Sequence, residues 1–342
     1  MKKTVLYPEL TVIRKPPPNY GEMHPLKDTF ICLKETFPPV CRLEISNAYV
    51  SPFGVVYKNG LVVRESVYSM FKPASFYLSF FKKRLLNKVV KVDGDCLIAH
   101  NSYFQNYYHW LLEAVPRLYV MKEEAPNLKL ILNADSPGFI RQYAELFGFK
   151  EIIYVKEDYL VKAQRVVFPG YTSRGLAMYE PILRDMAKWI TEKFEVTVPA
   201  EATKNIFITR KNARYRRLLN EAEVIDYLSG KGFEIVTLED LTVKEQIALF
   251  VSARNVIGTQ GAGMSNMIYA VHARLLVTII HEEHPDDAYF NLTNMYGTDC
   301  YYFQCPGAGN FSYKNNDDIT ADMNKLKAVC EKYIFNSEQK ES

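Results

Sequence analysis

Residues 256–266 read VIGTQGAGMSN, a short apolar run that leads into a glycine-rich turn and a predicted helix from about Met264. The glycines Gly258, Gly261 and Gly263 let backbone amides approach a ligand closely. The N-terminus of the helix that follows presents unpaired N–H groups with a partial positive charge. The stretch therefore predicts either a diphosphate site or an ordinary tight turn between a buried strand and a helix.

The glycine spacing separates this loop from the common nucleotide motifs. It is G-x-x-G-x-G, whereas the dinucleotide fingerprint is G-x-G-x-x-G and lies in the first βα turn of its domain. The loop also lacks the Lys-Ser/Thr pair of a phosphate-binding P-loop. NAD and ATP motifs are not matched, and a nucleotide-sugar epimerase, which needs the early fingerprint, is disfavoured.

Short apolar runs alternate with helical patterns on both sides of this loop. In the second half of the chain the predicted strands are 205–209, 233–238, 255–259 and 274–280, and the helices are 220–230, 242–253 and 263–271. Earlier strands are predicted at 97–101, 128–132, 151–155 and 165–169, with helices at 107–124 and 137–147. Such alternation indicates parallel sheets covered by helices on both faces.

The pattern predicts two α/β domains with a cleft between them. The N-terminal domain, residues 1–190, begins with a proline-rich extended arm and a β-rich part, in which Asn59-Gly60 is typical of a hairpin turn. The C-terminal domain spans residues 200–315. Residues 316–342 form a final helix and tail that we expect to pack back across the other domain.

A basic cluster lies at the end of the predicted strand 205–209, where open α/β sheets bind ligands. Its members are Lys204, Arg210, Lys211, Arg214, Arg216 and Arg217. Arginine can hold phosphate oxygens through two parallel hydrogen bonds. The cluster is explained equally well as a solvated basic loop or as a patch for acidic lipid or nucleic acid.

Residues 106–118 read NYYHWLLEAVPRL and place His109, Glu113 and Arg117 four residues apart on one helix face. A His/Glu pair can perform acid–base chemistry if it faces a cleft. The alternative is an exposed ladder of charges. Pro116 is expected to kink this helix or to end it early.

Composition narrows the class of protein. The 342 residues carry a net charge of +3, too small by itself to indicate nucleic-acid binding. Six scattered cysteines lack metal-site spacing, and Asp93-Gly94-Asp95 reads better as a turn than as a metal motif. We therefore expect no metal site. No apolar stretch reaches the roughly 18 residues needed for a membrane span, so we expect a cytoplasmic protein.

The helical and basic stretches resemble motifs of glycosyltransferase family 61. The family shows N-x-x-H-W-hydrophobic-x-D-x-hydrophobic-P-R, matched here by residues 106–117. It next shows a strand that ends in an arginine, matched by Arg210. An R-x-x-N-E motif follows, matched by Arg217, Asn220 and Glu221.

The glycine loop completes the resemblance, which covers about residues 100–280. A helical glutamine, matched by Gln246, precedes G-x-H-G-A-G-hydrophobic-S/T-N, matched by residues 258–266. Three positions depart from the family: Glu113 replaces an aspartate, Gln260 replaces a histidine, and the strand after the loop lacks a glutamate. Glu282 and Glu283 are the available substitutes for the last.

The resemblance implies a GT-B fold, with two Rossmann-like domains, and an inverting transfer that needs no metal or other cofactor. It implies a nucleotide-sugar donor, which we expect to be a UDP-sugar, and a hydroxyl group on a glycan acceptor in surface or capsular polysaccharide synthesis. Glu113 is then the first candidate for the base and His109 the second. Asn106, Trp110 and Arg117 belong to the acceptor side.

The donor side collects the basic and glycine-rich positions. The expected donor-binding residues are Arg210, Lys211, Arg217, Asn220, Glu221, Gln260, Gly261, Ala262, Gly263, Met264 and Asn266. The alternative is a catalytically inactive scaffold that keeps the fold and binds a nucleotide sugar. We expect no nucleic-acid partner and no transmembrane span, and peripheral membrane association through basic residues remains open.

Overall fold

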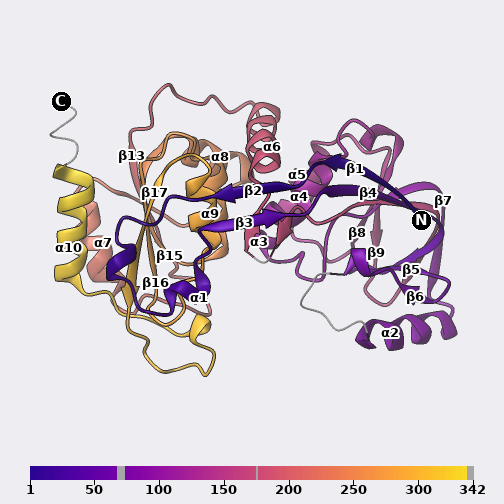
Figure 1. The fold of residues 1–342 in the computed structure, drawn as a ribbon, viewed down its shortest axis with the longest axis horizontal. Helices are drawn as coiled ribbons and strands as arrows, with labels where there is room; N and C mark the ends of the chain where they lie inside the picture. Colours follow the sequence, from indigo (N-terminus) through magenta and orange to yellow (C-terminus); the bar gives the residue numbers. More distant parts are fainter. Residues whose placement is uncertain (68–73, 175, 337–342) are drawn as a thin grey trace. The chain divides into compact units, whose positions relative to one another are not determined.

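A computed structural model of the chain describes residues 1–67, 74–174 and 176–336. It forms two compact units, the first made of Met1–Thr11 and Thr36–Met186, the second of Val12–Glu35 and Ala187–Ser342 (Figure 1). Each unit is built around its own sheet with helices beside it. The chain is therefore α/β, as predicted.

The first unit contains a mixed eight-stranded sheet. The order is β6 (Leu61–Val62), β5 (Val56–Lys58), β4 (Val40–Val50), β10 (Leu160–Pro169), β7 (Val89–Leu97), β8 (Lys129–Asn133) and β9 (Glu151–Val155), and β1 (Lys2–Tyr7) also pairs with β4. From β10 to β9 the strands run parallel, as predicted. Around β4 they run antiparallel, so the β-rich start extends the same sheet.

Two turn predictions in this unit have opposite outcomes. The hairpin is confirmed, because β5 and β6 pair antiparallel across Asn59 and Gly60, whose φ angles are 51° and 80°. The predicted turn at Asp93-Gly94 is wrong, because both residues lie within strand β7. Gly94, at φ 83°, lies where the register with β10 shifts, so its positive φ serves a β-bulge.

The motif helix of the first unit is shorter than the predicted 107–124 and irregular. It comprises α3 (Tyr107–His109), a π-helical turn (Trp110–Ala114) and α4 (Val115–Tyr119). Pro116 has no N–H group, so the regular hydrogen bond to the carbonyl four residues earlier cannot form. The π turn directly before it is a common way to absorb such a break.

The second unit contains a five-stranded, wholly parallel sheet, which confirms the predicted strands. The order is β14 (Glu234–Val236), β13 (Lys204–Ile208), β15 (Ala253–Thr259), β16 (Leu275–His281) and β17 (Asp299–Cys305). Helices of this unit include α7 (Glu221–Gly230), α8 (Val243–Val251), α9 (Ala288–Asn294) and a 3₁₀ helix (Ala262–Tyr269). The strand β17 was not predicted.

The N-terminal arm contributes to the second unit as well as to the first. The side chain of Asn19 pairs with the edge strand β17, donating to the Tyr302 carbonyl at 2.9 Å and accepting from the Tyr302 amide at 3.2 Å. The amide of His24 donates to the side chain of Gln304. The arm thus covers groups that an edge strand would otherwise leave unpaired.

The final helix packs within its own unit, and the prediction that it crosses to the other domain is wrong. Helix α10 (Met323–Cys330) lies beside α7 (Figure 1). Its buried Leu326, Val329 and Cys330 join one apolar cluster with Val224 and Leu228 of α7. Burial of this stripe against the second sheet fixes where the helix packs.

Two further findings concern the described part of the chain. None of its helices is both long and apolar enough to cross a bilayer. The six cysteines are free, and five of them are buried.

Two glycines with almost the same positive φ give a test of the first unit. Gly54 has φ 82°, and a Cβ there would lie 2.0 Å from the carbonyl oxygen of His100. Gly94 has φ 83° and nothing within 4 Å. We expect Gly94→Ala to lower the free energy of unfolding by about 1–2 kcal/mol, from φ strain alone. Gly54→Ala should cost at least about 2 kcal/mol more. Equal losses in thermal and chemical unfolding would contradict the steric argument.

Candidate functional site

Two loops of the second unit lie at the same edge of its sheet. Strands β13 and β15 are neighbours and run parallel, with Ile208 opposite Gly258. From β13 the chain places β14 on one side, and β15, β16 and β17 then follow on the other side. The order in which strands are added therefore reverses between β13 and β15, although all five strands are parallel. Parallel sheets of this kind bind ligands outside the carboxyl ends of the strands at such a reversal. The basic loop after β13 and the glycine loop after β15 are thus brought together at the expected place.

The glycine loop has no room for side chains at two positions. A Cβ on Gly261 would lie 1.8 Å from the guanidinium Nη1 of Arg210. A Cβ on Gly263 would lie 2.5 Å from Cδ1 of Leu238. The Tyr289 hydroxyl donates to the Gly261 carbonyl and fixes the start of the 3₁₀ helix. Glycine at these positions therefore serves close approach.

The carboxylate of Glu221 fixes the backbone at Arg210. It accepts from the Arg210 amide at 2.8 Å and from the Thr209 hydroxyl at 2.9 Å. The Arg210 Nη2 group donates to the Tyr215 carbonyl at 3.0 Å, and its buried Nε has no hydrogen-bond partner among the described residues. Burial, with the nearby charge of Arg216, lowers the pKa of Arg210. This fixed, incompletely satisfied cation suits an anionic ligand.

The adjacent arginines 216 and 217 have different surroundings. Arg217, predicted for the anionic ligand, instead pairs with Asp318, to which its Nε and Nη2 donate at 3.0 and 2.7 Å. Arg216 has a left-handed backbone, φ 56°, and its charge acts on Arg210, Asp286 and Tyr289 around the glycine loop. Sequence reasoning placed Arg216 in the basic cluster and omitted it from the site.

Two of the predicted donor-side residues are buried and support the loop from within. Gln260 donates its side-chain amide to the buried carboxylate of Asp286. Asn266 donates to the side chain of Gln246 at 2.8 Å and to the Gly263 carbonyl at 3.1 Å. These contacts support the loop from beneath, and the predicted donor contact of both residues stays a prediction.

The other predicted positions divide between the interior and the surface. Met264 is buried beneath Gly258, and Ala262 begins the 3₁₀ helix. The side chain of Asn220 exchanges two hydrogen bonds with the backbone of Ala321 and so ties α7 to the C-terminal segment. Lys211 is exposed.

The motif helix of the first unit places an imidazole beside a buried carboxylate. Asn106 caps the helix by accepting from the Tyr108 amide. Nδ1 of His109 lies 3.0 Å from Oε2 of Glu113, and the same oxygen accepts from Asn101 at 2.6 Å. The Glu113 side chain is 0% exposed, whereas that of His109 is 21% exposed. Of the two, only the imidazole reaches the surface.

Arg117 and Trp110 lie in the interior of the first unit. The guanidinium of Arg117 donates twice to the Pro169 carbonyl, at 2.9 and 2.7 Å, and once to that of Ala99. It therefore joins the ends of β10 and β7. Trp110 is 0% exposed. Both side chains are buried in the structure, and their predicted place on the acceptor side stays a prediction.

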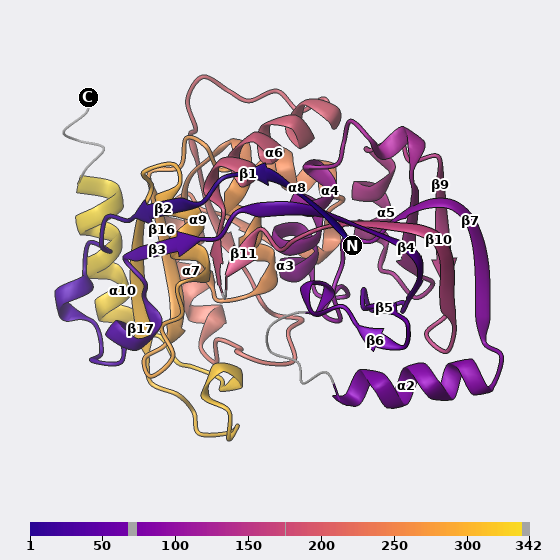
Figure 2. The same ribbon diagram turned by 45° about the vertical axis from the view of Figure 1, so that its right-hand side comes forward.

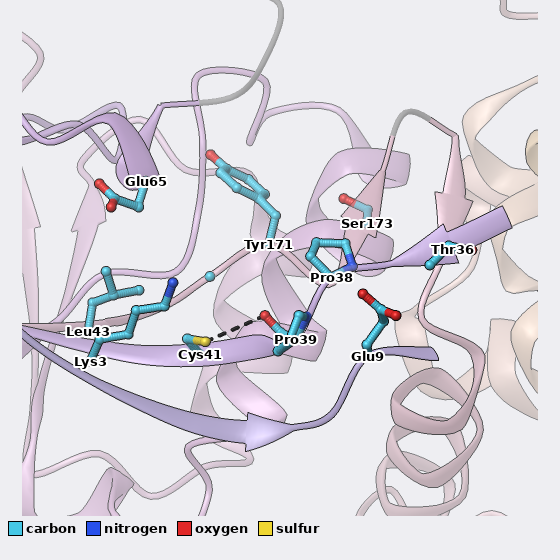
Figure 3. A pocket seen from close by; sticks show the side chains of 11 residues that line it. Lys3, Glu9, Thr36, Pro38, Pro39, Cys41, Leu43, Glu65, Tyr171 and Ser173 are labelled. Carbon is cyan, nitrogen blue, oxygen red and sulfur yellow. Dashed lines mark hydrogen bonds between the residues drawn. The ribbon is translucent and has the colours of Figure 1, made fainter. Parts of the chain in front are cut away.

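A pocket of about 540 Å³ opens next to this interior (Figure 3). Its lining is Lys3, Glu9, Thr36, Pro38, Pro39, Cys41, Leu43, Glu65, Gly170, Tyr171 and Ser173. The Tyr171 ring lies 4.5 Å from the Arg117 guanidinium, so one aromatic side chain links the pocket to the motif helix. Burial raises the pKa of Tyr171 to about 12. Sequence reasoning missed this pocket because its residues come from distant segments.

The polar cluster His281, His284, Asp286 and Asp287 has separate roles. The Asp287 carboxylate accepts from the Cys32 amide, and Nδ1 of His281 accepts from the Glu283 amide. Asp286 serves the glycine loop through Gln260. In the described ranges no group of three or more His, Cys, Asp or Glu side chains is arranged to hold a metal ion.

Comparison with known proteins identifies the family. The family model described as Glycosyltransferase 61 matches residues 107–277, which is half of the chain. The matched segment begins at the motif helix and ends within β16, so it includes the His109–Glu113 pair, Arg210 and the glycine loop. A search of curated proteins found no match.

The buried carboxyl of Asp286 makes a pH prediction. Burial raises its pKa to about 7, against an ordinary value of 3.8. The stabilising effect of the neutral carboxyl is complete below about pH 4 and is lost as the pH rises through 7. Asp286→Asn should therefore flatten the dependence of melting temperature on pH between these values. A variant that keeps the slope of the natural protein would show that other groups cause it.

Proposed function

The chain belongs to glycosyltransferase family 61, and on that premise we propose that it moves a sugar from a nucleotide-sugar donor to a glycan hydroxyl with inversion and without a metal. One observation carries the donor side of this proposal. A half-buried guanidinium, Arg210, packs against Gly261 at the point where the strand order of the parallel sheet reverses. Such a position suits the diphosphate of a nucleotide sugar.

The chemistry of the leaving group explains why two arginines are needed there. When the bond between the anomeric carbon and the diphosphate breaks, its electron pair stays on the diphosphate oxygen. Arg210, Arg216 and the N–H groups at the start of the 3₁₀ helix can stabilise that negative charge. Two guanidinium groups in one partly buried site supply positive charge that other transferases take from a divalent metal.

Geometry favours His109 over Glu113 as the group that takes the acceptor proton. An ionised carboxylate only accepts hydrogen bonds, so Glu113 orients Nδ1–H of His109 towards itself. In the neutral imidazole Nε2 is then the proton acceptor. As the hydroxyl oxygen bonds to the anomeric carbon, its proton passes to Nε2. Glu113 becomes a positioning residue that stabilises the resulting imidazolium, which reverses the order expected from sequence.

The pocket of Figure 3 is the candidate for the rest of the acceptor. It combines an aromatic ring, Tyr171, with the carboxylates of Glu9 and Glu65 and the hydroxyls of Thr36 and Ser173. Flat rings and convergent polar groups are what a sugar chain needs for stacking and hydrogen bonding. His109 and Glu113 do not line this pocket, so we assign to it sugars beyond the reacting one.

The finer assignments remain part of the same proposal. The two units form a GT-B enzyme, in which the second unit binds the donor. The donor is a UDP-sugar, and the glycan belongs to a surface or capsular polysaccharide made in the cytoplasm. The parallel sheet of the second unit and its basic loop support the first of these statements. The others follow from the resemblance to the family.

Adjacent arginines provide a matched test of the donor site. Arg216→Met should weaken the binding of UDP about 30-fold or more, because a guanidinium is lost from a partly buried phosphate contact. Arg217→Met should change it less than about twofold, because Arg217 is bound to Asp318. Isothermal titration calorimetry with UDP, ADP and GDP, with and without EDTA, measures both effects. The same titrations show which nucleobase the donor site binds.

The outcomes separate the possibilities for the donor site. A larger loss with Arg217→Met would restore the assignment made from sequence. Binding that EDTA abolishes would overturn the metal-free proposal. Tight binding of a nucleotide sugar with neither transfer nor hydrolysis would favour the inactive scaffold.

Substitutions of His109 and Glu113 test their roles through the relative sizes of the losses in kcat. His109→Gln should lower kcat by about 100-fold to 10,000-fold, because the proton acceptor is lost. Glu113→Gln should lower kcat by a smaller factor, and Glu113→Asp should restore part of the rate, since it keeps the carboxylate. The Kd for the donor should stay constant throughout. A larger loss with Glu113→Gln than with His109→Gln would make Glu113 the base.

A further inference from the structure

Helix α2 (Ala74–Leu85) of the first unit has two faces of opposite character. Its inner face carries Phe80, which is 1% exposed and stacks on Tyr57 with ring centroids 4.5 Å apart. On the opposite face Leu78, Phe81 and Leu85 are 79%, 58% and 88% exposed. Positions 78, 81 and 85 form one stripe on a helix. An apolar stripe therefore lies open to solvent opposite the buried one.

The stripe continues beyond the helix itself. Leu86, directly after α2, is 56% exposed, and Leu61 of the neighbouring hairpin is 66% exposed. The hairpin turn is close, because a Cβ on Gly60 would lie 3.9 Å from the Phe81 ring. Scattered exposed leucines are ordinary, but a continuous row of large apolar side chains marks an interaction surface. Figure 2 shows α2 at the periphery of the first unit.

The charge around α2 identifies the kind of surface it fits. Between Glu65 and Asp93 the sequence contains six lysines and arginines and no acidic residue. Two of these cations are engaged within the first unit, because Lys88 pairs with Asp158 and Lys83 donates to the Glu157 carbonyl. Lys82 is exposed between the apolar positions of the stripe, and Arg84 is exposed beside the Tyr49 ring. Apolar side chains with flanking cations complement the acyl chains and phosphates of an anionic bilayer. A protein partner would instead need an acidic surface of matching shape.

We propose that α2 is an interfacial helix that binds the first unit to an anionic membrane. The helix lies parallel to the bilayer surface, with Leu78, Phe81 and Leu85 inserted at the level of the acyl chains. Lys82 extends its ammonium group to the lipid phosphates. Phe80 anchors the opposite face to the sheet through Tyr57. This inference is independent of the transferase chemistry, because none of these residues belongs to the donor site or the His109–Glu113 pair.

Vesicle flotation of the full chain tests the proposal. One set of vesicles contains phosphatidylcholine alone, and the other contains equal parts of phosphatidylcholine and phosphatidylglycerol. The protein should float with the anionic vesicles only. Leu85→Ser should lower the partition coefficient about tenfold, because burial of a leucine side chain is lost. The matched control is Ile13→Ser, since Ile13 is also apolar and exposed, at 78%, but lies elsewhere. It should leave partitioning unchanged.

A second pair of variants tests the charge. Lys82→Glu should lower partitioning about tenfold or more at low salt, because one cation near the lipid phosphates is reversed. Lys188→Glu, on the exposed side of α6 (Glu180–Lys193), should have little effect. Equal binding to neutral vesicles, or no effect of Leu85→Ser, would overturn the proposal. So would a dimer in light scattering that Leu85→Ser dissociates, because the stripe would then bind a second copy of the chain.

Discussion

The guanidinium of Arg210 fills the space in which a side chain at position 261 would begin, and the geometry of the proposed donor site depends on that contact. With glycine at position 261 the backbone comes close enough to present its amides beside a cation, whereas a Cβ there would displace the guanidinium. The guanidinium itself donates to the Tyr215 carbonyl at 3.0 Å, a hydrogen bond that it would lose on withdrawing. The strand reversal between β13 and β15 brings these two loops together, so topology and side-chain contact select the same place.

Both units use a carboxylate to orient another group, and that carboxylate is buried in Glu113 and half-buried in Glu221. In the first unit Glu113 is bound by Asn101 and lies beside Nδ1 of His109, and only the imidazole is partly exposed. In the second unit Glu221 orients the backbone of Arg210 in the same indirect way. A carboxylate that is fully used by internal donors is a poor direct reagent but a good determinant of orientation. This difference between contact and positioning is the reason why we propose His109, and not Glu113, as the group that takes the proton.

Sequence patterns predicted the architecture better than the roles of single residues. The hairpin at Asn59 and Gly60 and the parallel strands of the second unit depend on local turn chemistry and apolar periodicity, which a sequence displays. Periodicity does not show that a glycine serves a bulge, as Gly94 does. Nor does it show which of two adjacent arginines is paired with an internal carboxylate. That choice depends on the left-handed backbone at Arg216 and on Asp318, about one hundred residues away.

The hydrogen bond from Gln260 to Asp286 gives a physical explanation for glutamine at the position where the family has a histidine. The amide of Gln260 donates to a buried carboxyl that also accepts from the Ala288 amide at the start of α9. An imidazole N–H at position 260 would supply a donor of the same kind. Glutamine thus keeps the link between the glycine loop and α9 while removing one group that titrates near neutral pH. The support of the glycine loop through Asp286 therefore needs a hydrogen-bond donor at position 260 and no imidazole, which argues against reading the departure as decay of the site.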